Sequence, residues 1–182
     1  MNPSNQAEYE ALRQTIRERG TARLLAVLGG VAVWAALATA LPAAGLRGAV
    51  ILVPLVILAA TFEVNFFMHT GVERIGRYVQ VFYEERANMV GWETTAMNYG
   101  MRFPSGLDPL FSTVFAAAAL VNVFIPLVVA GRTPGWIALS LFAHMIFGYR
   151  IATARKLAAS QRALDLDRFR NLANEIAKSS IL

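Results

Sequence analysis

Three polar side chains lie inside otherwise apolar stretches of the sequence. Glu63 is the only carboxylate within such a run, Asn122 lies in a second run, and His144, one of two histidines, lies in a third. At 1.5 Å of helix rise per residue, Glu63 lies about 21 Å into its run and Asn122 about 18 Å. We predict that Glu63, Asn122 and His144 are candidates for one intramembrane polar cluster that binds a small ligand, an ion or a proton.

Each of these groups also has a purely structural interpretation. A charged Glu63 at this depth is costly unless it faces protein or water, pairs with a cation or becomes protonated. It could instead join two helices through a hydrogen bond, and Asn122 and His144 could do the same at about 0.6 kcal/mol per interhelical bond. The sequence leaves both interpretations open.

A second candidate site follows the second apolar run, where His69, Glu73 and Arg77 are spaced four residues apart. On one helix face at the membrane interface, His69 and Glu73 could perform acid/base chemistry on a lipid or another membrane substrate. The same spacing is typical of a solvated ladder in which Glu73 and Arg77 lie on the water-facing side. We expect the solvated ladder.

No motif typical of catalysis or nucleotide binding occurs in the sequence. It has no Gly-rich phosphate loop, no nucleophile-elbow serine and no paired-histidine zinc motif. The chain has no cysteine, which excludes thiolate metal sites and disulfides. We therefore predict no cofactor, no metal site and no catalytic activity of the chain's own. The net charge of +5 comes without a basic stripe interleaved with aromatic residues, so we expect no nucleic-acid partner.

The composition points to a lipid environment for the helices that carry these residues. Hydrophobic residues make up 56% and charged residues 16% of the 182 positions, against about 45–50% and about 25% in soluble domains. The apolar residues gather in runs over 24–41, 48–69, 109–131 and 136–149, and about 20 such residues cross a bilayer. The sequence predicts an all-α integral membrane helical bundle with four transmembrane helices.

The basic residues predict the orientation of these spans. The two short loops between paired spans hold Arg47 and Arg132, whereas the other fifteen of the 17 basic residues precede span one, lie between spans two and three or follow span four. The positive-inside rule makes those regions cytoplasmic. We expect a multi-pass protein of the bacterial inner membrane with both termini in the cytoplasm, in contact with anionic lipid headgroups.

Five segments follow from this topology. We predict an amphipathic N-terminal cytoplasmic helix over 1–22, a transmembrane hairpin over 23–70, a cytoplasmic helix and loop over 71–108, a second hairpin over 109–150 and a cytoplasmic C-terminal helix over 151–182. Spans two and four continue into long cytoplasmic helices, because their helical periodicity runs on without a breaker. Trp92 and Tyr99 are expected in the loop, against headgroups.

These features favour a non-catalytic, oligomeric or complex-forming membrane component. Ala26 and Gly30 form a small-residue pair that permits close helix contact, either with a second copy or within the chain. The alternative is a membrane-embedded enzyme that uses His and Glu in acid/base chemistry at the cytoplasmic leaflet. Such an enzyme needs a pocket in which two titratable groups reach one reacting atom.

Overall fold

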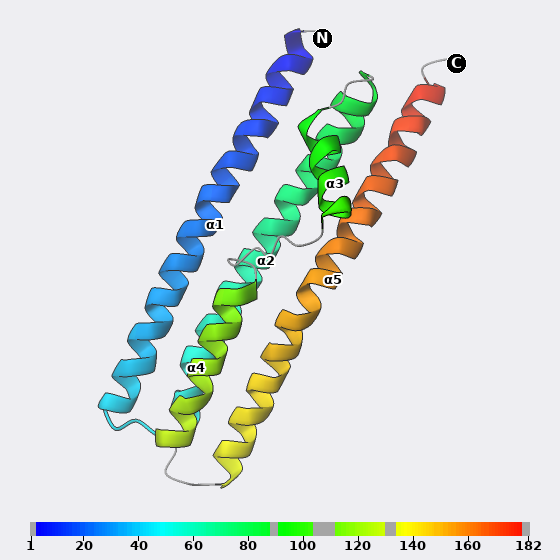
Figure 1. Cartoon of the computed structure of the whole chain (residues 1–182). Coiled ribbons are helices and arrows are strands. Elements are labelled where there is room, and N and C mark those ends of the chain that lie inside the picture. The colour runs from blue at the N-terminus through cyan, green and yellow to red at the C-terminus, as the bar shows by residue number, and fades with distance from the viewer. Residues whose placement is uncertain (1–2, 88–90, 104–111, 130–133, 180–182) are drawn as a thin grey trace. The chain divides into compact units, whose positions relative to one another are not determined.

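The computed structural model describes residues 3–87, 91–103, 112–129 and 134–179, and over these ranges it contains helices and turns but no strand (Figure 1). This confirms the all-α fold. The elements in chain order are α1 (Pro3–Ala43), the 3-10 helix η1 (Gly48–Leu52), α2 (Val53–Val79), the π-helix η2 (Gln80–Glu85), α3 (Trp92–Arg102), α4 (Val114–Val129) and α5 (Pro134–Ser179).

The chain divides into two compact units. Unit 1 comprises Met1–Thr21, Met68–Leu107 and Lys156–Leu182, and unit 2 comprises Ala22–Phe67 and Asp108–Arg155. Unit 2 therefore holds the apolar runs, and unit 1 holds most of the charged residues.

Three helical stretches are long and apolar enough to cross a membrane: Asn5–Ala43, Gly48–Glu85 and Pro134–Ser179. Each far exceeds the roughly 20 residues that a bilayer requires. The third predicted span corresponds to α4, whose apolar helix Val114–Ile125 is shorter, while residues 109–111 and 130–131 of that run lie outside the described residues. A count of three candidate spanning helices is thus what the described residues support.

The turn after α1 shows why the first helix ends where the sequence predicts. Gly45 adopts a φ of +70°, which favours glycine, and its N–H donates to the carbonyl of Pro42 at 2.9 Å. The N–H of Leu46 donates to the carbonyl of Leu41 at 3.1 Å. These two bonds form a Schellman motif, which satisfies carbonyls that the end of the helix would otherwise leave unpaired.

Unit 2 is organised around buried aromatic rings. The fully buried ring of Phe62 on α2 lies edge-on to Phe115 of α4, with centroids 5.1 Å apart, and to Phe147 of α5 at 5.8 Å.

Gly30 of α1 packs directly on the side chain of Thr61, where a Cβ would come within 2.2 Å of Oγ1. The small residue at position 30 therefore serves helix contact within the chain.

Large apolar side chains cover the outside of unit 2. The exposed ones occur on all four of its helices and include Leu25, Leu28, Val56, Leu120, Val121, Phe124, Phe142, Met145 and Ile146. Soluble proteins rarely expose a contiguous apolar surface of this kind.

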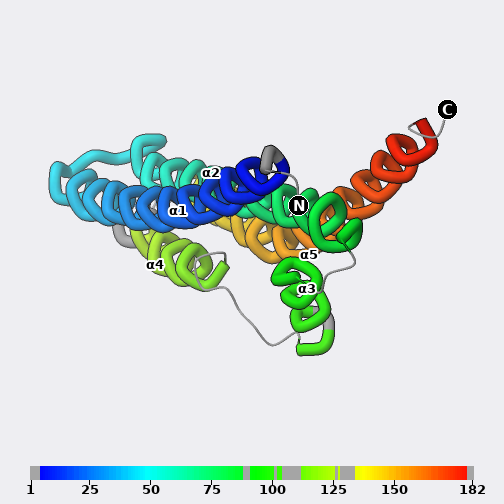
Figure 2. The backbone as a smooth tube through the Cα atoms, turned by 90° about the horizontal axis from the view of Figure 1, so that it is seen from above, coloured from blue at the N-terminus to red at the C-terminus, as the bar shows by residue number. Residues whose placement is uncertain are grey.

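Two segments differ from the sequence-based expectation. Residues 92–102, predicted as part of a loop, form the helix α3, which follows the end of the long α2–η2 helix (Figure 2). Residues 3–22, expected to form a helix of their own, are the first part of the continuous helix α1. A helix-breaking residue is missing between them and the first apolar run, since Gly20 alone does not end a helix.

Candidate functional site

A chain of hydrogen bonds in unit 2 joins three helices. The indole Nε1 of Trp34 on α1 donates to Oδ1 of Asn122 on α4 at 2.8 Å. Nδ2 of Asn122 lies 2.9 Å from Nε2 of His144 on α5, and Nδ1 of His144 lies 2.7 Å from the backbone carbonyl of Ser140. Asn122 and His144 are both buried. The structure therefore brings two of the three residues of the predicted polar cluster together.

The direction of each bond in this chain is fixed by its two ends. Indole N–H can only donate and the carbonyl of Ser140 can only accept, so Asn122 must present its oxygen to Trp34 and its amide N–H groups to His144. His144 then accepts at Nε2 and donates from Nδ1. This pattern requires the neutral imidazole with its proton on Nδ1, and every donor and acceptor named has a partner.

Glu63 does not share this chain of bonds. Its carboxylate forms a two-point ion pair with Arg150 of α5, with Nε at 2.8 Å from Oε1 and Nη2 at 2.9 Å from Oε2. The side chain of Glu63 is 51% exposed, so it lies at the surface of unit 2 and not in its interior as the depth argument suggested. The guanidinium of Arg150 also lies 4.4 Å from the centroid of the Phe66 ring and 5.5 Å from that of Phe62.

A second polar contact in unit 2 was not predicted. Asn65 is fully buried, and its Oδ1 accepts a 2.6 Å hydrogen bond from Nε of Arg23 on α1. Asn65 lies two residues after Glu63 in the second apolar run, but the sequence gives no indication of which helix supplies its partner.

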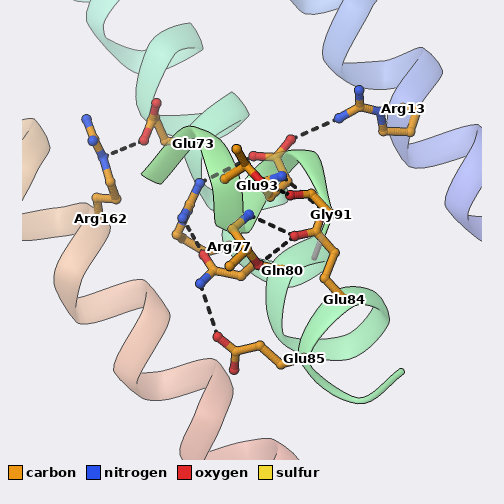
Figure 3. Close-up of polar contacts among 11 residues, drawn as sticks. Arg13, Glu73, Arg77, Gln80, Glu84, Glu85, Gly91, Glu93 and Arg162 are labelled. Atoms are coloured by element: carbon orange, nitrogen blue, oxygen red, sulfur yellow. Dashed lines mark hydrogen bonds and ion pairs between the residues drawn. The ribbon is translucent and has the colours of Figure 1, made fainter. Parts of the chain in front are cut away.

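Unit 1 contains a dense network of buried charges around α3 (Figure 3). Arg77 of α2 is only 3% exposed, and its guanidinium bonds Gln80 through Nη1 and Glu93 through Nη2, the latter at 3.3 Å. Glu93 also pairs with Arg13 of α1 at 2.9 Å. The prediction that Arg77 lies on the water-facing side of its helix is therefore wrong, because α3 covers that position.

Glu84 of η2 acts as the cap of α3. Its Oε1 accepts the backbone N–H of Glu93 at 2.9 Å, and its Oε2 accepts the N–H and the hydroxyl of Thr94, both at 2.7 Å. A carboxylate stabilises a helix N-terminus by satisfying free amides and opposing the helix dipole. The carboxylate occupies the space beside Gly91, where a Cβ would come 2.2 Å from Glu84. Glu84 lies in the π-helix η2, and short π-helical segments are frequent at functional sites.

The predicted acid/base pair lies in the same unit. Glu73 forms an ion pair with Arg162 of α5 at 2.5 Å, and His69 lies one turn earlier on α2, partly buried. Arg74, the neighbour of Glu73, pairs with the buried Asp165 of α5 at 3.1 Å. These contacts tie α2 to α5 within unit 1.

Burial sets the protonation behaviour of the network. Burial raises the pKa of Glu93, and the guanidinium groups of Arg77 and Arg13 partly offset that rise.

In the described part of the chain, no three carboxylate or imidazole groups converge in a way that could hold a metal ion.

Comparison with known proteins gives no relative. No protein family, no curated protein and no solved structure matches this chain.

Proposed function

We propose that this chain is an integral membrane protein with four spans, in which unit 2 crosses the bacterial inner membrane and unit 1 lies in the cytoplasm. The exposed apolar side chains of unit 2 suit contact with acyl chains. Twelve of the 17 basic residues lie in the segments of unit 1, which suits the cytoplasmic side of a membrane. Both termini would then be cytoplasmic.

The observation that carries this proposal is that unit 2 presents large apolar side chains on its outside and pairs polar side chains with one another. The half-buried Trp34 and the buried Asn122 and His144 bond one another across three helices, while large apolar side chains such as Leu120 and Met145 are exposed. Polar groups in a bilayer must find partners within the protein, because lipid offers none. A water-soluble bundle would carry polar and charged side chains at most of these outward positions.

We further propose that the protein is a non-catalytic component of a membrane complex or homo-oligomer. Three of the four titratable groups considered for chemistry form contacts between helices: Glu73 with Arg162, Glu63 with Arg150, and His144 with Asn122. Contacts of this kind fix the relative positions of helices, as a scaffold requires.

The enzyme alternative has less support. A cavity of about 470 Å³ in unit 1 is lined by Asn5, Tyr9, Phe82, Tyr83, Glu84, Arg86, Ala87 and Gly91. Of these lining residues, Glu84 is the only carboxylate, and it is committed to capping α3. Acid/base catalysis needs two titratable groups that reach the same atom, and the proposed pair of His69 and Glu73 is not among the lining residues.

The mass of the purified full chain in lipid nanodiscs tests the assembly proposal. Light scattering should give a mass of two or more chains, or of one chain with a partner at fixed stoichiometry. A single chain of 182 residues without a partner would contradict the proposal. Nanodiscs are required because detergent can separate weakly packed helices, which associate without a hydrophobic driving force.

A further inference from the structure

The helix α3 has two faces of different character. Glu93 and Thr94 face the rest of unit 1, where Glu84 caps the helix and Arg77 pairs with Glu93. The aromatic residues Trp92, Tyr99 and Phe103 are 67%, 65% and 51% exposed. Tyr99 lies seven residues after Trp92 on the same line of α3, and Phe103, the residue after the end of α3, has its ring centroid 4.9 Å from that of Tyr99. We call these three residues the aromatic face of α3.

The charge around the aromatic face suits an anionic surface. Glu93 is the only acidic residue of α3, and it is buried in ion pairs with Arg13 and Arg77. Arg102 is exposed beside the aromatic face, with its guanidinium 6.0 Å from the centroid of the Phe103 ring. The rings of Tyr99 and Phe103 lie 4.9 Å apart and form one continuous aromatic patch. Tyrosine and tryptophan prefer the headgroup level of a bilayer, where ring and polar tip are both solvated.

The position of α3 along α2 brings this patch toward the proposed membrane boundary. A Cβ at Gly76 would come 2.6 Å from Oε2 of Glu93, so Glu93 lies beside Gly76 of α2. Gly76 is seven residues beyond His69, the predicted end of span two, which corresponds to about 10 Å of helix rise. Figure 1 shows α3 running in the direction opposite to α2, and Phe103 follows Glu93 by up to about 15 Å of helix. Tyr99 and Phe103 can therefore reach the headgroups.

We propose that the aromatic face of α3 docks into the interfacial region of the lipid bilayer, with Tyr99 and Phe103 among the headgroups and Arg102 paired with an anionic one. The proposal rests on the proposed insertion of unit 2 in the membrane. A lipid surface is chosen over a protein partner because the patch can reach the height of the headgroups along α2 and carries a basic flank without an exposed acid.

Spin labels on single cysteines test this docking, since the native chain has no cysteine. The first label replaces Gly100 of α3, where a Cβ meets no atom within 4 Å. A second label at Met145, exposed on unit 2, reports membrane insertion, and a third at the exposed Asn174 of unit 1 reports water. Each labelled full chain is placed in nanodiscs, and collision of the label with oxygen and with a water-soluble nickel chelate is measured.

The label at Gly100 should show oxygen and nickel accessibilities between those at Met145 and Asn174, as expected of the interface. Replacing Tyr99 and Phe103 by serine should move its values toward those of Asn174. Arg102→Gln should reduce the difference between phosphatidylcholine discs and discs that also contain phosphatidylglycerol.

Three results would overturn the proposal. Accessibilities at Gly100 equal to those at Asn174 would show that α3 faces water. Low accessibility to both reagents would show that a protein, such as a second copy of the chain, covers it. If the label at Met145 also behaves as in water, the membrane proposal itself fails along with the docking; if only the Gly100 label does, the docking alone fails.

Discussion

The Nε2 atom of His144 lies 2.9 Å from Nδ2 of Asn122, and that amide also accepts the indole N–H of Trp34. Asn122 is therefore the central link between α1, α4 and α5 in unit 2. An amide fits this position because its oxygen accepts from the indole N–H of Trp34 and its nitrogen donates to the imidazole of His144.

Replacing Asn122 by leucine should lower the stability of the protein by about 1–2 kcal/mol. It removes two interhelical bonds of about 0.6 kcal/mol each and leaves the half-buried indole of Trp34 and the buried imidazole of His144 without these partners. Thermal unfolding in detergent, followed by circular dichroism, measures the change. Ser140→Ala is the matched control with little expected effect, because His144 bonds the carbonyl of Ser140 at 2.7 Å and its hydroxyl only at 3.4 Å. Equal midpoints for Asn122→Leu and the native protein would contradict this role.

The cap of α3 depends on the absence of a side chain at position 91. Gly91→Ala should displace the carboxylate of Glu84 and cost about 1–2 kcal/mol through loss of the cap. The φ of Gly91 is −93°, which alanine tolerates, so the effect should come from the contact alone.

A double-mutant cycle isolates that contact. In a Glu84→Ala background, Gly91→Ala should cost much less than in the native chain, because the clash and the cap are already gone. Additive losses would show that the two residues act independently.

Under the proposed topology, the ion pair between Glu63 and Arg150 lies in the membrane-spanning unit 2, so the carboxylate and the guanidinium should depend on each other for neutralisation. We expect Glu63→Gln to lower the stability, because it leaves Arg150 without its anionic partner, and Glu63→Arg to lower it further, because it places two cations together. Exchanging both residues, as Glu63→Arg with Arg150→Glu, should restore part of the loss. An unfolding midpoint of Glu63→Gln equal to that of the native protein would contradict this dependence.

Stability should depend on pH through Glu93. Burial raises its pKa above the reference value of about 4.3, so the folded protein binds a proton that the unfolded chain releases. The contribution of this group is fully present below the unfolded pKa, and it is lost as the pH rises through the folded pKa. Relative to Glu93→Gln, the native protein should therefore become less stable over that interval. Unfolding midpoints of both proteins across a pH series measure the difference; a native protein that gains relative stability would show that Arg77 and Arg13 outweigh burial.

The sequence predicted the helices well where a single stretch of chain determines them. The apolar run that ends at Leu41 predicts the end of α1 at Ala43 to within two residues, and the apolar periodicity predicts the continuous course of α2 and α5. It failed for α3, because that helix is capped by Glu84 from another element and its own residues are polar and bounded by Gly91. The signal that could have identified it is the run of Trp92, Tyr99 and Phe103 at helical spacing.

For the candidate site, the sequence predicted only how deep each residue lies along its apolar run. Counting residues placed Asn122 and His144 at overlapping levels, and they meet. The same count said nothing about the rotation of α2 around its axis, which turns Glu63 toward Arg150. Likewise, the burial of Arg77 depends on α3, which the prediction lacked.

Labelling of single cysteines in intact cells tests the central claim, the membrane topology, most directly. Ala44 and Gly135 lie in the exposed ends of the two predicted hairpins, and Gln14 and Lys178 are exposed in unit 1. With an impermeant thiol reagent added outside, cysteines at Ala44 and Gly135 should react, and those at Gln14 and Lys178 should react only after the cells are opened. Reaction at all four positions, at none, or in the reverse pattern would contradict a bundle of four spans with both termini in the cytoplasm.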